Sequence, residues 1–202
     1  MKKFIWVIAI LVLCACGSSK NKKAESKTSN ASLEQRLQEY RKLNEELNID
    51  KLMDYIYPKL FTLAPREDMV KGMKDFFASD EIKVVIDSLT IDRIHPVFQI
   101  GDGSYAKVEY SMVMRMDMSP KDTVEDEGQN EMIVQTMRAQ YGEENVDIDK
   151  ATGMIRIRTV NPMVAVKDEY AKEWSFVSLK EDDPMINQLF SKEVLDKLKT
   201  YK

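Results

Sequence analysis

The sequence predicts an α+β domain, because the spacing of its apolar residues changes from helical to strand-like along the chain. From about residue 32 to residue 77, apolar residues recur every three or four positions, as in helices that bury one face. From residue 82 onward they alternate, as in a half-buried antiparallel sheet. Capping residues near the C-terminus then predict two short helices after the sheet.

Three helices are predicted before the sheet. The first spans residues 32–47 and begins at Ser32, which has capping-box spacing to Gln35. The second follows Asp50 and ends before Pro58, and Pro65 fits the first turn of the third. The residues expected to face the core share the helical period: Leu33, Leu37, Tyr40, Leu43 and Leu47 in the first helix, Leu52, Met53 and Ile56 in the second, and Met69, Val70, Met73, Phe76 and Phe77 in the third.

A long antiparallel hairpin is predicted next. Ile82, Val84 and Ile86 alternate in phase, but residues 89–91 fall out of phase, which indicates a bulge or a sharp bend within one strand. Residues 101–103, Gly-Asp-Gly, have the composition of a hairpin turn. The strand that follows alternates cleanly, with Lys107, Glu109, Ser111 and Arg115 on one face and Ala106, Val108, Tyr110, Met112, Met114 and Met116 on the other.

The second half of the sheet is predicted with one helix inserted before it. Residues 120–128 are acidic and indicate an exposed loop, and a helix over residues 131–141 follows with Met132, Ile133, Thr136, Met137 and Tyr141 at helical spacing. A hairpin turns at Gly153 and continues to residue 166, and a last strand spans residues 172–179. Asp183 and Ser191 are predicted to cap the two C-terminal helices.

The N-terminus has the features of a secretion signal. Lys2 and Lys3 precede ten apolar residues, a stretch too short to span a bilayer as a helix. Residues 13–17, Leu-Cys-Ala-Cys-Gly, resemble the bacterial lipobox, in which the cysteine after two small residues is lipidated. Cys16 fits this pattern better than Cys14, which would need Val12 and Leu13 in the small-residue positions. We therefore expect residues 1–15 to be a lipoprotein signal peptide and Cys16 to carry the membrane anchor.

Three parts of the chain are expected: the signal peptide, a lipidated cysteine with a flexible tether over residues 16–31, and a single domain over residues 32–202. No cysteine remains in that domain, which excludes disulfides, cysteine nucleophiles and cysteine metal sites. From Ser32 onward the chain has 24 basic and 33 acidic residues, a net charge of −9, so nucleic acid is not an expected partner. The tether has a net charge of +3, which suits either an anionic membrane surface or a solvated linker.

The order of these elements resembles the nuclear transport factor 2-like superfamily, also called ketosteroid isomerase-like. Residues 47–58, LNIDKLMDYIYP, look like its second-helix phrase, and residues 172–176, KEWSF, look like its closing strand. The resemblance covers about residues 32–180 and implies a cone-like, strongly curved sheet whose wide side the three N-terminal helices close, leaving a pocket. The chain departs from the usual form by an insertion over residues 120–153. A fold-level resemblance does not by itself transfer function.

An apolar pocket is the first candidate site. Its lining is expected to come from the inward strand face and from aromatic residues near it: Tyr57, Val108, Tyr110, Met112, Met114, Trp174 and Phe176. Tyr110 could donate one hydrogen bond to an apolar ligand. A filled core without a cavity would explain the same residues.

Catalytic and metal sites are weakly indicated. His95 is the single histidine, and an acid–base role would need an inward carboxylate partner, so an ordinary surface histidine is the favoured interpretation. Met112, Met114, Met116 and Met118 could bind Cu(I), but methionines at this spacing are typical of core packing. Glu144, Asp147 and Asp149 do not have the spacing of a calcium loop and are expected on a solvated strand and turn. No catalytic residue, metal or cofactor is therefore predicted.

Three functions remain open from the sequence. The favoured one is a non-enzymatic lipoprotein of the bacterial cell envelope, on the outer membrane and facing the periplasm, that binds a small apolar ligand or an envelope protein partner. The second is an isomerase- or dehydratase-like enzyme of the cone family that uses His95 or an inward acid with Tyr110. The third is a structural assembly module whose pocket is filled and whose open sheet face carries an exposed apolar patch.

Overall fold

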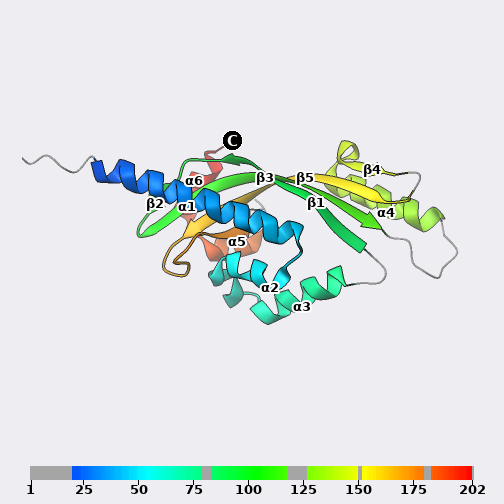
Figure 1. The fold of residues 1–202 in the computed structure, drawn as a ribbon, viewed down its shortest axis with the longest axis horizontal. Helices are drawn as coiled ribbons and strands as arrows, with labels where there is room; N and C mark the ends of the chain where they lie inside the picture. Colours follow the sequence, from blue (N-terminus) through cyan, green and yellow to red (C-terminus); the bar gives the residue numbers. More distant parts are fainter. Residues whose placement is uncertain (1–19, 79–82, 118–126, 150–151, 180–182, 202) are drawn as a thin grey trace, which may run out of the picture.

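The protein is an α+β domain with an antiparallel sheet, as predicted, and the sheet has six strands and is open. In a computed structural model (Figure 1), residues 20–78, 83–117, 127–149, 152–179 and 183–201 are described. The helices are α1 (Lys20–Glu45), α2 (Ile49–Leu52), α3 (Arg66–Phe77), α4 (Glu127–Tyr141), α5 (Pro184–Leu189) and α6 (Lys192–Lys199), with short 3-10 turns η1 (Met53–Tyr55), η2 (Pro58–Thr62) and η3 (Glu143–Asn145). The strands are β1 (Lys83–Ile94), β2 (Phe98–Ile100), β3 (Gly103–Asp117), β4 (Val146–Ile148), β5 (Ile155–Lys167) and β6 (Ser175–Ser178).

The sheet is centred on two long strands, β3 and β5. Its strand order is β1-β3-β5-β4, with β2 added to β3 and β6 added to β5 at the other end. Every strand pair is antiparallel. The strand β5 runs through Asn161 and Pro162 without a break, as the sequence predicts. On its edge away from β3, β5 therefore pairs with two short strands, with β4 near residue 156 and with β6 near residue 165.

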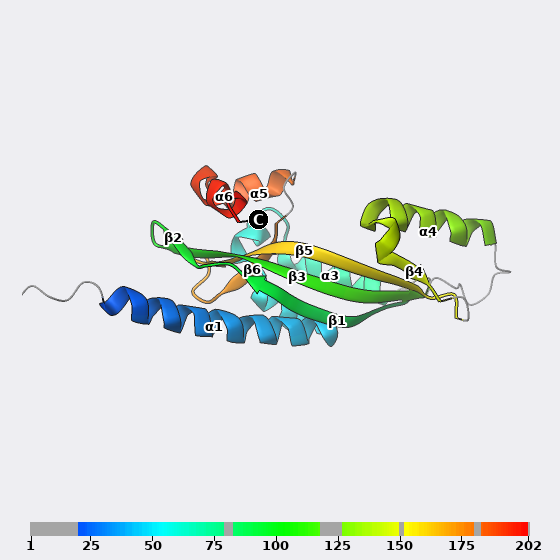
Figure 2. The same ribbon diagram turned by 90° about the horizontal axis from the view of Figure 1, so that it is seen from above.

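The two faces of the sheet are covered by different helices. Val108 pairs with Met163 and Ala106 with Ala165, so these side chains share the face on which α1 packs. The opposite face, at the β6 end, packs against α5 and α6, and Figure 2 shows those helices across the sheet from α1. The buried residues of the α1 side are Leu33, Leu37, Ala106, Val108, Met163, Ala165, Trp174 and Phe176.

The far end of the sheet is covered by α4. Met116 and Ile155 lie on the same face of the pleat as Val108, yet they pack against Val134 of α4 rather than against α1. Figure 2 shows α4 on the side of the sheet opposite α1. Strand twist accounts for this, because it turns one face of a long strand progressively about the strand axis.

The predicted irregularity in the first long strand is confirmed. The register of β1 against β3 shifts between Ile86 and Ser88 and again between Ile91 and Arg93. The first shift keeps Leu89 on the buried face, and its N–H donates to Glu45 of α1 at 3.2 Å. The hairpin turn before β3 is also confirmed, with Gly101 at a positive φ of 57°.

The start of the first helix differs from the prediction. The helix α1 begins at Lys20, so the expected tether is helical from that residue and Ser32 does not begin the helix. Residues 20–31 hold several lysines and alanines and no proline or glycine, and these residue types favour continued helix. The Ser32 hydroxyl instead accepts a hydrogen bond from the indole Nε1 of Trp174 at 3.2 Å.

Two predicted helix faces are wrong in part. No residue of α3 is buried, and Phe76 is 46% exposed, because this helix meets the rest of the domain mainly through Met69 and Phe77. In α4, Met132 and Thr136 point to solvent, and the inward side is formed by Ile133, Val134, Met137 and Tyr141. The apolar period was identified correctly in α4, but its phase was off by one position.

The C-terminal helices have the predicted caps. The Asp183 side chain accepts a hydrogen bond from the Met185 N–H, and the Ser191 side chain accepts one from the Val194 N–H. The last strand is shorter than predicted, since β6 begins at Ser175, yet Trp174 and Phe176 do lie in one cluster.

Several predictions fall outside the described residues. The signal peptide, Cys16, Ile82, Met118 and most of the acidic loop at residues 120–128 are among them. Within the described part of the chain, no helix combines the length and the apolar character needed to cross a bilayer.

Candidate ligand cavity

A cavity of about 240 Å³ opens where β6 ends, between the helices on the two sides of the sheet. For scale, an engineered apolar cavity of about 150 Å³ binds benzene. This cavity therefore has room for a ligand somewhat larger than benzene. Its lining comes from α1, η2, α3, three strands and α5, and consists of Tyr40, Ile56, Leu60, Met69, Tyr110, Met163, Phe176, Val177, Ser178, Asp183, Met185, Ile186 and Leu189.

The wall formed by Ile56 and Leu60 is fixed to the sheet by the backbone. Ile56 forms an isolated parallel bridge with Phe176 of β6. The N–H of Tyr57 donates to the carbonyl of Phe176 at 3.0 Å. On the α1 side, the Tyr40 ring packs on Phe176 with 4.9 Å between ring centroids. These contacts hold Phe176 between α1 and the segment before η2, and thus position one side of the cavity.

Tyr110 supplies a hydroxyl that makes no hydrogen bond to the described residues and is not fully buried, so water can reach it. Burial raises the pKa of this phenol, so it stays protonated at neutral pH and can donate. Burial also raises the pKa of Tyr40, and the proximity of Tyr110 adds to that effect. The two tyrosines thus present neutral polar groups within a mainly apolar wall.

The remaining lining is mainly apolar and rich in methionine. Met69, Met163 and Met185 come from α3, β5 and α5, and flexible thioether side chains adapt to ligands of different shapes. Asp183 is the lining carboxylate, and its side chain already caps α5 by accepting from the Met185 N–H at 2.9 Å. The arrangement suits a neutral, apolar ligand that carries one hydrogen-bond acceptor for Tyr110.

The seven residues predicted to line the pocket are divided among several places. Tyr110 and Phe176 line the cavity. Val108 and Trp174 are buried beneath α1, and Met114 packs in the cluster that α4 covers. Met112 is half-buried, and Tyr57 lies in the cluster on the α5 and α6 side, where its hydroxyl donates to Asp168 at 2.6 Å.

Sequence reasoning missed the lining residues from α3 and α5. Met69 was expected in the core because it occupies an inward position of the third helix, and Ile186 was not assigned to either place. No local pattern distinguishes the two situations, because the cavity results from how these helices meet β6.

His95 is buried, and the interpretation as a surface histidine is wrong. Its side chain is 8% exposed, and Nε2 lies 3.1 Å from Oε1 of Glu109. The pKa of the Glu109 carboxyl is lowered, first by the hydrogen bond from His95 and further by the charges of His95, Arg93 and Lys107. The His95 ring also packs on Tyr201, with 4.9 Å between centroids.

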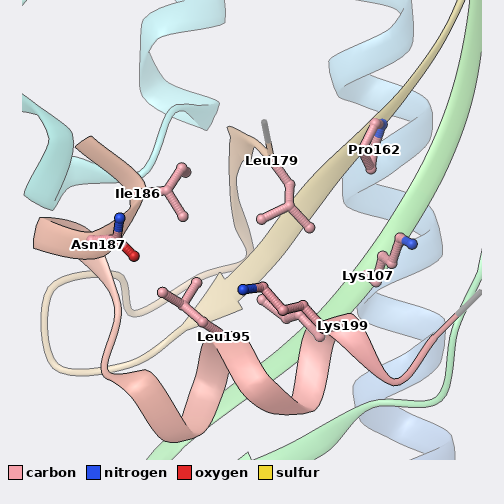
Figure 3. A pocket seen from close by; sticks show the side chains of 8 residues that line it. Lys107, Pro162, Leu179, Ile186, Asn187, Leu195 and Lys199 are labelled. Carbon is pink, nitrogen blue, oxygen red and sulfur yellow. The ribbon is translucent and has the colours of Figure 1, made fainter. Parts of the chain in front are cut away.

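The pair of His95 and Glu109 does not face the cavity. Glu109 precedes Tyr110 on β3, and successive strand residues point to opposite faces. Lys107, on the face of Glu109, donates to the carbonyl of Tyr201 at 2.8 Å. Figure 3 shows the hollow between Lys107 and α6, which measures about 40 Å³ and so has room for water but not for a substrate. The cluster ties the C-terminal residues to the sheet.

No group of three or more metal-ligating His, Cys, Asp or Glu side chains occurs in the described ranges. Met112, Met114 and Met116 share a face of β3, and Met116 is buried against α4. Asp147 pairs with Arg158 at 2.7 Å. Comparison with protein families, with curated proteins and with solved structures finds no match. The functional argument therefore starts from the residues of this chain.

Proposed function

We propose that the protein is a lipoprotein of the bacterial cell envelope whose domain binds a small apolar ligand with a single hydrogen-bond acceptor. The observation that carries this proposal is the cavity of about 240 Å³ with the unpartnered Tyr110 hydroxyl in its wall. An apolar cavity with few polar groups is the usual form of a small-molecule site. The ligand would displace water from apolar walls and accept a hydrogen bond from the Tyr110 hydroxyl.

The envelope location is supported by the N-terminal sequence. Residues 13–17 fit the lipobox, and acyl chains on Cys16 would bury many methylene groups in the bilayer. No acidic run follows Cys16, and we propose the outer membrane, with the domain facing the periplasm. Mass spectrometry of the protein from its host should find residues 1–15 removed and Cys16 acylated. Cys16→Ala should block both changes and Cys14→Ala should not, and an intact leader in the unaltered protein would contradict the proposal.

We also propose that the domain is a variant of the nuclear transport factor 2-like cone. Three α-helices and two short 3-10 turns precede the sheet, β1 carries two register shifts, and the cavity lies between α1, α3 and the sheet. These features support the resemblance stated from the sequence. An experimental structure whose sheet does not superpose on that superfamily would contradict this part of the proposal and leave the ligand cavity untouched.

The ligand proposal is tested with two probes of the same shape. The first is 2-acetylnaphthalene, which carries a carbonyl acceptor, and the second is 2-isopropenylnaphthalene, which does not. Because Tyr110 offers one donor, the ketone should bind about fivefold more tightly, the size of one net hydrogen bond. In Tyr110→Phe the two probes should bind alike. Isothermal calorimetry or ligand-observed NMR measures both affinities.

A variant that fills part of the cavity provides the second test of the ligand proposal. Met69→Trp extends a larger side chain from the partly exposed wall formed by α3, and binding of both probes should fall by at least about tenfold. Phe76→Trp is the matched control, since Phe76 is an exposed residue of the same helix and lies outside the cavity lining. Unchanged binding in Met69→Trp, or equal loss in both variants, would contradict the proposal.

An enzymatic role has one specific observation in its favour, the close pair of His95 and Glu109. That pair points away from the cavity, and neither of its residues lines the hollow of about 40 Å³ beside Lys107. A hydrolytic or isomerase activity lost in His95→Gln with the fold retained would favour the enzyme over the binding protein.

A further inference from the structure

The cover over one face of β3 is interrupted in the middle of the strand. At one end of this face Val108 is 0% exposed beneath α1, and at the other end Met116 is 7% exposed beneath α4. The three side chains between them on the same face, Tyr110, Met112 and Met114, are each only half-buried. A largely apolar stretch of the sheet, starting at the cavity residue Tyr110, is therefore less well covered than the core on either side of it.

The helix α3 spans the same stretch. Met69 lines the cavity together with Tyr110, and Phe77 packs against the same cluster as Met114. Met69 and Phe77 are separated by roughly 12 Å along the helix axis, and Tyr110 and Met114 by roughly 13 Å along the strand. Figure 1 shows α3 below the sheet, with its C-terminal end directed toward the start of β1. The helix and the strand thus extend over about the same length, from the cavity to the cluster that α4 covers.

The helix α3 covers this stretch only loosely. None of its residues is buried, and Met73, between Met69 and Phe77 on its apolar side, is half-buried. Two surface ion pairs attach the helix to the segment before it: Lys74 binds Asp50 at 2.8 Å, and Arg66 binds Asp54 at 2.9 Å. Exposed ion pairs contribute little to stability, so α3 can shift away from β3 at low cost.

On the basis of the ligand function proposed above, we propose that the ligand carries an alkyl chain, which leaves the cavity beside Tyr110 and lies on the methionine strip. This strip consists of Met112 and Met114 of β3 and Met73 of α3. Unbranched thioether side chains adapt to the shape of a hydrocarbon chain. Each methylene group that is fully buried against them raises the affinity about fourfold.

An alkyl chain fits the chemistry of the strip better than a segment of a partner protein does. The three side chains of the strip are uncharged, and a thioether is only a weak hydrogen-bond acceptor. The backbone of β3 is already paired on both edges, with β1 and with β5, so it has no free edge for a partner strand. Peptide groups placed on the strip would lose water without gaining hydrogen bonds, whereas a hydrocarbon chain has no polar group to satisfy.

The test uses the full chain, labelled with ¹³C at the methionine methyl groups, in phosphatidylcholine nanodiscs. The short probe is 2-acetylnaphthalene and the long probe is 2-octanoylnaphthalene, which has the same ring and ketone and a longer alkyl chain. The short probe should shift the NMR signals of Met69 and Met163, which line the cavity. The long probe should shift those two signals and also the signals of Met112 and Met114, because its chain extends beyond the cavity.

A charge placed on the strip should weaken binding of the long probe alone. In Met73→Glu the long probe should bind at least about tenfold more weakly, because the chain would lie against a carboxylate, and the short probe should bind within about twofold of the unaltered protein. Met132→Glu is the matched control, since Met132 is a helical methionine that is 64% exposed on α4, and it should bind both probes normally. NMR titration of the Met163 signal measures the affinities. Partition of a probe into the lipid cancels when variants are compared in the same nanodiscs.

The outcomes separate the alkyl-chain proposal from the ligand cavity itself. If the long probe shifts only Met69 and Met163, the chain does not lie on the methionine strip, and the alkyl-chain proposal is wrong while the cavity stands. Equal loss of the long probe in Met73→Glu and Met132→Glu would overturn it as well. If neither probe shifts Met69 or Met163, the ligand cavity is contradicted and the alkyl-chain proposal falls with it.

Discussion

The two ends of the sheet are built from the same two strands but are used differently. At the β6 end, α1 covers one face and α5 with α6 covers the other, and the helices leave a cavity where β6 stops. At the β4 end, α4 covers one face, and none of the described helices covers the other, which carries Arg115, Arg156, Arg158 and Val160 and which we call the arginine face. The alternation of side chains along β3 and β5 is the same throughout.

The difference between the two ends shows that the alternation of residues along a strand does not by itself determine whether a face of the sheet is covered or open. Lys107, Glu109, Ser111, Val113 and Arg115 occupy equivalent positions of β3 on one face. The first two lie beneath α6 and the C-terminal residues, whereas none of the described helices covers the last three, which are half-buried beside β5. Segments distant in sequence therefore determine which half becomes core and which half remains an open surface.

The largest expected effect separates the covered half of this face from the open half. Leu198→Ala removes a side chain of α6 that is 1% exposed and should lower the free energy of unfolding by about 2–5 kcal/mol. Val160→Ala, on the open half, should change it by less than about 0.5 kcal/mol. Urea denaturation followed by circular dichroism measures both. Similar losses in the two variants would mean that Val160 is buried in the protein as it exists in solution.

The second effect concerns the loop that closes the covered end. The Tyr57 hydroxyl donates to Asp168 at 2.6 Å, and Asp168 also accepts from the N–H groups of Tyr170 and Ala171. Tyr57→Phe leaves one partly buried carboxylate oxygen without this donor and should lower the free energy of unfolding by about 1 kcal/mol in thermal or urea denaturation. Tyr170→Phe, at an exposed ring, is the matched control and should be nearly neutral. A neutral Tyr57→Phe would argue against the hydrogen bond.

The contribution of Glu109 to the free energy of unfolding should depend on pH. This residue lies at the boundary between the covered half and the open half of the face. The folded-state pKa of Glu109 is lowered from its ordinary value of 4.5, chiefly by the hydrogen bond from His95. Its stabilising contribution is therefore present above about pH 4.5 and is lost as the pH falls through the lowered folded-state pKa. The difference in unfolding free energy between the unaltered protein and Glu109→Gln should shrink on acidification. Glu169→Gln, at an exposed residue, should show no such trend.

The smallest effect is expected at the arginine face itself. Arg156→Thr removes a charge that lies opposite Arg115 on β3 and opposite Asp147 on β4, and it places a good strand former there, so stability should change by less than about 0.5 kcal/mol. Arg158→Thr, which breaks the ion pair with Asp147, should not stabilise the domain. Precise urea titrations of both variants make this comparison. A larger loss of stability in Arg156→Thr would indicate that Arg156 has an internal role.

The sequence predicted local structure well where one residue type dictates geometry. The bulge in β1 followed from the phase change between Ile86 and Leu89, the β2–β3 turn from Gly101, and the C-terminal helix starts from Asp183 and Ser191. The bulge, the turn and the caps each depend on residues close in sequence, so contacts with distant segments do not change them.

The sequence predicted less well what depends on distant contacts. The burial of His95 follows from the pairing of Glu109 and the stacking of Tyr201, neither of which a local pattern reveals. The exposure of Phe76 follows from the limited contact between α3 and the sheet. Likewise, Tyr110 was singled out as a donor, but its neighbours from α3 and α5 become lining residues only after those helices meet β6.

The central claim is that the space beside Tyr110, Met163 and Phe176 is an accessible apolar cavity. Crystals of the domain exposed to pressurised xenon test it most directly, because xenon enters apolar cavities without requiring a specific ligand. We expect xenon density between these three side chains, reduced in Met69→Trp and retained in Phe76→Trp. Side chains that fill the space, with no xenon density among them, would contradict the account.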